Sequence, residues 1–156
     1  MRHAIGIRLA TIEDARQISA LATRLSWTHV LPEQPSAGVE KLLAGISPHA
    51  IAGRIADGHR HHVAEAGVTL VGVIGMRDDS RVHLLFVDES FQRRGLARAL
   101  WQVAMDACVA VANPEPITVN ASAFSVAAYR RLGFVDLGPQ QQRDDVIATP
   151  MAYRLR

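Results

Sequence analysis

The chain has little cysteine, little lysine and few aromatic residues. Cys108 is the only cysteine among 156 residues, which excludes an internal disulfide and leads us to expect a cytoplasmic protein. No apolar run approaches the roughly 18 residues that cross a bilayer. The opening residues, MRHAIGIRLATIEDARQ, lack the long apolar core and small-residue cleavage site of a signal peptide. We therefore expect no membrane partner.

The excess of positive charge is small and consists almost entirely of arginine. Lys41 is the only lysine, and the formal net charge is +2. Such a balance suits an anionic small ligand and does not require a nucleic acid. The 49% of apolar residues and 21% of charged residues are ordinary for a globular protein. The length and composition predict a single domain over residues 1–156.

Two familiar phosphate-binding motifs are also absent, namely G-x-x-x-x-G-K-[ST] and G-x-G-x-x-G. The sequence instead contains DESFQRRGLARAL at residues 88–100, between an apolar run that ends at Val87 and an amphipathic stretch that begins near Arg94. A helix N-terminus has unpaired N–H groups that favour anions. Gly95 permits close backbone approach and Arg93 adds a cationic donor. These residues alone leave two alternatives, a solvated helix start and a phosphate site.

Periodicity predicts a chain of alternating strands and helices. Thr11 and Asp14 form a capping-box pattern at the start of a helix, and Ser122 is a candidate cap of a later one. We expect loops over Trp27–Ser36 and Pro139–Val146. The expected strands are Ile5–Leu9, His62–Glu65, Leu70–Met76, Arg81–Val87, Ile117–Asn120, Phe134–Leu137 and Ala148–Leu155, with one or two short helices in Val39–Gly58, a long helix from Arg94 that Pro114 and Pro116 end, and a helix that ends at Gly133. This order predicts an α/β (α+β) fold with helices packed on a mixed sheet.

Three segments resemble the GNAT-type N-acetyltransferases. The stretch QRRGLA at residues 92–97 resembles the family signature [QR]-x-x-G-x-[GA], and the preceding LLFVDESF is similar to the fourth strand and its exit. VNASAFSVAAYRRLGF at residues 119–134 is similar to the family's fifth strand and following helix, and TPMAYRL near the end resembles the closing strand of a small bacterial-type branch. The resemblance covers nearly the whole chain. It implies a mostly antiparallel sheet of about seven strands with about four helices, and a fourth and fifth strand that splay apart.

The resemblance also implies how the co-substrate acetyl-CoA binds. The backbone amides of the signature would hold the pyrophosphate, and the strand before it would pair with the pantetheine arm. An N–H near Val87 would polarise the acetyl carbonyl. Asn120 and Ser122 would lie beside the arm, although Ser122 replaces an asparagine of many relatives and a simple helix cap is the alternative. The implied co-substrate-binding residues are Leu85, Phe86, Val87, Gln92, Arg93, Arg94, Gly95, Leu96, Ala97, Asn120, Ser122 and Tyr129.

The implied reaction is direct attack by an amine on acetyl-CoA in a ternary complex. Tyr129 matches the family tyrosine that protonates the departing thiolate; the alternative is a half-buried aromatic residue. The candidate bases are His83 and Glu65, and alternation predicts that His83 shares a strand face with Leu85 and Val87. A polar sheet residue is the alternative role for His83. Arg130 is a candidate for the 3′-phosphate, with an exposed helix arginine as the alternative.

Other reactive residues of the sequence receive structural assignments. The HRHH run at residues 59–62 would alternate between the faces of a strand, so we expect no metal. Cys108 lies on the apolar side of its helix and is expected to be a packed thiol. The acceptor would be a small amine or a peptide amine, and the resemblance is compatible with a homodimer. The alternatives to an enzyme are a non-catalytic acyl-CoA sensor and, less well supported, a nucleic-acid-binding domain that uses the arginines.

Overall fold

The computed structural model describes residues 4–111 and 116–154, which form one eight-stranded sheet flanked by helices. The strands lie in the order β1-β2-β3-β4-β5-β8-β6, and β7 pairs with β8. The elements are β1 (Ile5–Leu9), η1 (Ile12–Asp14), α1 (Ala15–His29), η2 (Leu31–Glu33), α2 (Ser36–Gly45), α3 (Pro48–Ala56), β2 (His61–Ala66), β3 (Thr69–Arg77), β4 (Arg81–Val87), η3 (Glu89–Phe91), α4 (Leu96–Ala110), β5 (Ile117–Ala121), α5 (Val126–Leu132), β6 (Val135–Asp136), β7 (Gln141–Arg143) and β8 (Val146–Tyr153).

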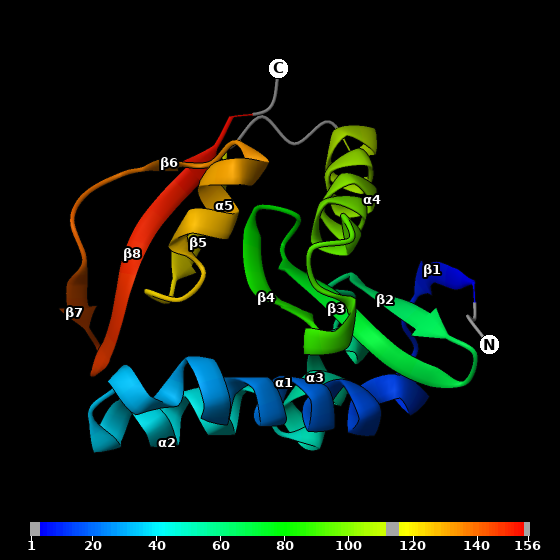
Figure 1. Ribbon diagram of the computed structural model, residues 1–156, viewed down its shortest axis with the longest axis horizontal. Helices are drawn as coiled ribbons and strands as arrows, with labels where there is room; N and C mark the ends of the chain where they lie inside the picture. Colours follow the sequence, from blue (N-terminus) through cyan, green and yellow to red (C-terminus); the bar gives the residue numbers. More distant parts are fainter. Residues whose placement is uncertain (1–3, 112–115, 155–156) are drawn as a thin grey trace.

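Helices cover both faces of the sheet, and each face has its own apolar core. Figure 1 shows α1, α2 and α3 below the sheet and α4 and α5 above it. The upper core contains Leu100 and Trp101 of α4, and the lower core contains Ile18 of α1 and Ile51 of α3. Each helix buries one apolar stripe and turns its polar face outward, as the periodicity predicts. In the described part of the chain no helix is long and apolar enough to span a bilayer.

The fourth and fifth strands separate soon after they meet. They are parallel, and a single residue pair, Arg81 with Thr118, joins them. All other pairings in the sheet are antiparallel. From this one pair the two strands diverge toward their C-terminal ends (Figure 1). The predicted mixed sheet and its splayed strands are therefore confirmed.

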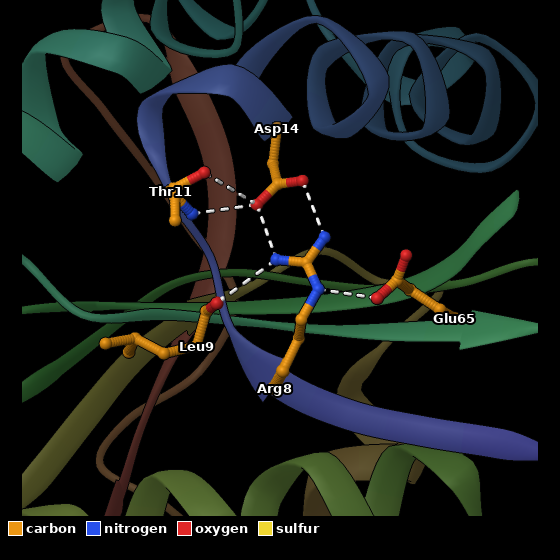
Figure 2. A network of polar contacts seen from close by, with 5 residues as sticks. All are labelled: Arg8, Leu9, Thr11, Asp14 and Glu65. Atoms are coloured by element: carbon orange, nitrogen blue, oxygen red, sulfur yellow. Dashed lines mark hydrogen bonds and ion pairs between the residues drawn. The ribbon is translucent and has the colours of Figure 1, made fainter. Parts of the chain in front are cut away.

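An ion-pair network fastens the first strand to the start of α1. The Arg8 guanidinium donates two hydrogen bonds to the Asp14 carboxylate, both 2.8 Å, and a third to Glu65 of β2 (Figure 2). The Asp14 carboxylate also accepts from the Thr11 backbone N–H at 2.7 Å, which confirms the predicted capping box. The Arg8 guanidinium holds the pKa of the Asp14 carboxyl below its usual range. This network is structural, and it occupies Glu65.

Several predicted boundaries are wrong. Residues 27–29 belong to α1, Leu31–Glu33 form η2, and Ser36 begins α2. The expected polar connection contains β7, which pairs with β8 as a hairpin. Ser122 does not cap a helix, because α5 begins after Ser125; the Ser122 and Ser125 hydroxyl groups contact each other instead. Pro114 and Leu155, expected at element ends, lie outside the described residues.

The predicted orientation of His83 is also wrong. The β3–β4 pairing runs from Met76 opposite Val82 to Gly75 opposite Leu84, so His83 is an extra residue in a β-bulge. A bulge reverses the alternation of the residues that precede it. Leu85 and Val87 therefore belong to the upper core, whereas His83 is close to Gly45 and Arg54 of the lower helices.

Candidate functional site

The connection from β4 to α4 has the backbone of an anion-binding loop. Arg93 and Gly95 both adopt the left-handed conformation, with φ of 62° and 77°. Gly95 is the N-cap of α4, and a Cβ on it would meet no atom within 4 Å. The glycine is therefore required by its φ rather than by crowding. Left-handed residues in such a turn direct successive N–H groups to one side, beside the positive end of the helix dipole.

Side chains around this connection fix it to the sheet. Gln92 donates from Nε2 to the Val87 carbonyl oxygen at 2.9 Å. Asp88 accepts from Ser90 N at 2.9 Å and from Arg24 of α1 at 2.7 Å. The Arg94 guanidinium lies over the Phe91 ring, 5.4 Å from its centre. Gln92 and Arg94 were both predicted to bind the co-substrate. In the structure their side chains contact the end of β4 and the connection itself, so the backbone of the loop is the part available to a ligand.

A cavity of about 800 Å³, here called the large cavity, extends from this loop along β4 toward α5. Nine of the predicted co-substrate residues line it: Leu85, Phe86, Val87, Gln92, Arg93, Gly95, Leu96, Ala97 and Tyr129. The sequence arguments missed His29 of α1, which stacks on Phe124 with ring centres 4.1 Å apart. Both of these residues line the large cavity as well. Neither residue belongs to the signature, so only the folded structure shows that His29 and Phe124 lie at the large cavity.

The edge of β4 presents free backbone groups to the gap between β4 and β5. The Asp88 N–H donates to the Val71 carbonyl oxygen of β3 at 2.8 Å. Successive residues of an antiparallel strand point their backbone groups to opposite sides, so the N–H groups of Val87 and Leu85 point away from β3, toward the gap. Because β5 pairs with β4 only at Arg81, no described strand covers these groups. An extended amide chain could therefore bind along this edge.

Tyr129 of α5 stands at the gap with its hydroxyl group unengaged. Its side chain is 5% exposed, and its ring packs edge-on against Phe134 at 5.2 Å. The Tyr129 hydroxyl has no hydrogen-bond partner within residues 4–111 and 116–154. Burial raises the pKa of this phenol, so it is protonated at neutral pH. It is therefore available as a proton donor.

Two neighbouring arginines of α5 have different surroundings. Arg130 donates twice to the Asp136 carboxylate, at 3.0 and 2.6 Å, and is engaged in this exposed ion pair. Arg131 lines the large cavity. Its carbonyl oxygen accepts from Arg98, another lining residue, at 2.7 Å. Arg131 rather than Arg130 is thus the α5 arginine placed to meet an anion.

A second cavity, of about 150 Å³ and here called the small pocket, lies on the other side of the gap. The two cavities share a wall of Val30, Leu85, Phe86, Ser125 and Tyr129. His83, Asn120 and Ser122 line the small pocket and not the large cavity. The site is thus a pair of chambers that meet at Tyr129.

Neither expected base has the properties of a base at neutral pH. Burial, assisted by the Arg54 guanidinium, lowers the pKa of His83 to about 4, against the opposing effect of the Gly45 carbonyl. Its Nε2 is buried and without a hydrogen-bond partner in the described chain. His83 is therefore an uncharged imidazole rather than a group that titrates near pH 7. Glu65 is bound by Arg8 and lines neither chamber.

The remaining candidate residues belong to the protein interior. His61 is buried beneath Gly75, and its Nδ1 contacts the His59 carbonyl oxygen at 3.0 Å. Residues 4–111 and 116–154 contain no group of three or more potential ligands that could hold a metal ion. Burial raises the pKa of the Cys108 thiol to about 11. This thiol is fully buried, as expected of a packed cysteine.

Comparison with known families agrees with this geometry. The family described as "Acetyltransferase (GNAT) domain" matches residues 30–155, which is most of the chain. The chain belongs to the GNAT acetyltransferase family. Membership implies acyltransferase activity and confirms the resemblance inferred from the signature. Among curated protein sequences, none matches the chain significantly.

Solved GNAT structures share the fold over their whole length. A GCN5-related N-acetyltransferase from Rhodopseudomonas palustris is 16% identical, with a TM-score of 0.79 over 99% of this chain and 98% of that one. A GNAT acetyltransferase from Staphylococcus aureus is 15% identical, with a TM-score of 0.77 over 98% and 100%. The PaiA N-acetyltransferase from Thermoplasma acidophilum, in complex with coenzyme A, is 15% identical, with a TM-score of 0.72 over 97% and 99%.

Proposed function

We propose that this protein transfers the acetyl group of acetyl-CoA to a primary amine, by direct attack of the amine in a ternary complex. The observation that carries the proposal is the meeting of two chambers at Tyr129, one of which begins at the β4–α4 loop. A GNAT relative binds coenzyme A, and the residues here fit that molecule. The functional unit would be a single domain over residues 1–156.

The large cavity would hold the co-substrate through backbone groups. The amides of Arg93–Ala97 would receive the pyrophosphate at the start of α4. Arg131 and Arg98 would face the outer phosphates. The Leu85 backbone at the open edge of β4 would pair with an amide of the pantetheine arm, as a strand would, and the adjacent Val87 N–H would remain for the thioester. Asn120 and Ser122 would contribute from the small pocket, on the acceptor side of the arm.

The chemistry needs stabilisation of one oxygen and protonation of one sulfur. The amine nitrogen bonds to the thioester carbonyl carbon while the carbon–sulfur bond breaks. The Val87 N–H, directed into the gap, would donate a hydrogen bond to the carbonyl oxygen as negative charge develops on it. The Tyr129 hydroxyl would donate its proton to the departing thiolate, and the amine nitrogen, which must lose a proton as the amide forms, would return one to the phenolate. Because His83 is uncharged and a weak base, the amine would arrive already deprotonated, with His83 assisting its placement.

Titration calorimetry with acetyl-CoA tests the first part of the proposal. We expect one molecule to bind per chain with a dissociation constant below the millimolar range, and the absence of heat at millimolar acetyl-CoA would contradict it. Release of free thiol in the presence of amines tests the second part. Binding without thiol release from any amine would favour a non-catalytic acyl-CoA sensor.

A further inference from the structure

The walls of the small pocket are uncharged. Of the side chains that line it, none is a carboxylate, an ammonium or a guanidinium group. Most of its surface is aliphatic, supplied by α2, β5 and β8 together with the end of α1. The lining apolar residues are Val30, Leu42, Ile46, Val119, Val146 and Ile147. Its volume of about 150 Å³ equals that of apolar protein cavities that bind a molecule of benzene's size.

Three polar side chains of the small pocket are hydrogen-bonded within the protein. The Gln34 side chain donates to the Ile147 carbonyl oxygen at 2.9 Å and accepts from the Ile147 N–H at 2.8 Å. These two hydrogen bonds hold the segment after η2 against β8 and so form one wall of the small pocket. The Ser122 and Ser125 hydroxyl groups pair with each other. Among the buried lining atoms of the described chain, His83 Nε2 is the one left without a partner.

A cation would be unstable in this pocket. Moving an ammonium group out of water without an anionic partner costs several kcal/mol. Arg54 donates to the carbonyl oxygen of the lining residue Gly45 at 2.6 Å, which places a positive charge behind the wall. The acidic side chains of the flanking segments, Glu33, Glu40, Asp144 and Asp145, are exposed and are not part of the lining. An amine would therefore enter in its uncharged, nucleophilic form.

The position of His83 sets the far end of the pocket. The gap between β4 and β5 is closed at Arg81, two residues before His83, and widens toward the shared wall at Leu85 and Tyr129. The reacting nitrogen belongs at the shared wall, so His83 meets the opposite end of the acceptor. A neutral imidazole nitrogen donates or accepts according to its tautomer. A hydroxyl group can do either, and it therefore complements both tautomers.

We propose that the acceptor is a primary amine on a compact, uncharged apolar body, with a hydroxyl group at the far end that bonds to His83 Nε2. This inference rests on the proposed acetyl transfer. It excludes polyamines, aminoglycosides and free amino acids, because each brings a second charge into the small pocket. Tyramine has the proposed chemistry, phenethylamine lacks only the hydroxyl group, and putrescine has a second ammonium group in place of the apolar body.

The first experiment compares acceptors on the intact protein. Acetyl-CoA binding is measured by calorimetry, acceptor binding to the CoA-saturated protein by saturation-transfer NMR, and turnover by thiol release. We expect kcat/KM for tyramine to exceed that for phenethylamine about tenfold and that for putrescine or phenylalanine at least a hundredfold. If acetyl-CoA binds and a diamine or amino acid is the better acceptor, or if no apolar amine binds, the inference is overturned and acetyl transfer stands. Failure of acetyl-CoA to bind overturns both.

Two variants test the individual contacts. His83→Leu should abolish the tenfold preference for tyramine over phenethylamine, and an unchanged preference would overturn the His83 contact.

Leu42→Glu places a carboxylate in the small pocket and should raise the ratio of putrescine turnover to phenethylamine turnover at least tenfold. Ala44→Glu, exposed on the same helix, is the matched control and should leave the ratio unchanged. Val146→Glu, from another wall of the small pocket, replaces Leu42→Glu if that variant does not fold.

Discussion

The two chambers of this protein differ in charge, in size and in the part of the chain that builds them. The large cavity is bordered by Arg93, Arg98 and Arg131 and by the start of a helix. The small pocket has no charged side chain in its lining and is about one fifth of the volume. Under the proposed function this difference would divide the tasks: one chamber would hold an anion through backbone and arginine, and the other would select its ligand by excluding charge.

The largest effect should come from the residue that belongs to both chambers. Tyr129→Phe keeps the ring and its packing on Phe134 but removes the hydroxyl group. We expect kcat to fall on the order of a hundredfold, the usual contribution of a positioned proton donor, while the dissociation constant of acetyl-CoA changes less than twofold. Steady-state kinetics and calorimetry measure the two quantities. Unchanged turnover would remove the role of Tyr129.

The next largest effect should be confined to the large cavity. Gly95→Ala forces an alanine into the left-handed conformation, at a cost of about 1–2 kcal/mol. If the loop relaxes instead, acetyl-CoA affinity should fall about tenfold. Gly53→Ala in α3 is the matched control, because Gly53 also has open space around it but no positive φ. Equal affinities of the two variants would contradict the loop's role.

A smaller effect should separate two adjacent arginines. Arg131→Ala should weaken acetyl-CoA binding about fivefold and lessen its dependence on salt, because an exposed charge near phosphate is screened. Arg130→Ala should leave affinity within twofold, since that side chain pairs with Asp136. Calorimetry at two salt concentrations measures both. A larger loss for Arg130→Ala would reverse the assignment.

The last effect is on stability and concerns His83 of the small pocket. The folded-state pKa of His83 is about 4, below its usual value of 6.5, so between these pH values the unfolded chain binds the proton and the folded chain does not. The free energy of unfolding should therefore decrease as pH falls through this window, by ~3 kcal/mol from His83. In His83→Leu the decrease should be shallower by that amount in denaturant titrations. An identical pH dependence would show that His83 does not titrate in this way.

Much of the fold follows from local patterns in the sequence. The strands from β1 to β5 and helix α4 follow from alternation and from a clear apolar stripe, and Gly133 ends α5 with a φ of 109° as expected. Strand β7 was missed because Gln141–Arg143 is short and polar and is stabilised only by its pairing with β8. The end of α1 was missed because Trp27 and Thr28 are exposed and give no apolar signal.

The part of the site formed by the signature could be predicted from the sequence. The part that depends on strand pairing and on contacts between distant residues could not. Arg93, Gly95, Leu96 and Ala97 line the large cavity, as predicted, because the glycine and the strand–helix order are local properties. The face of His83 depends on a bulge between two strands, and its pKa depends on burial and on Arg54, which is 29 residues away in sequence. Asn120 and Ser122 line the small pocket and not the large cavity through contacts that are also distant in sequence. No local pattern reports such contacts.

The measurement that tests the central claim most directly is a calorimetric titration of acetyl-CoA into the wild-type protein and Gly95→Ala, followed by thiol release with tyramine on the same samples. The two-chamber account predicts binding of one acetyl-CoA per wild-type chain, about tenfold weaker binding to the variant, and thiol release that requires the amine. Absence of binding at millimolar acetyl-CoA would contradict the account.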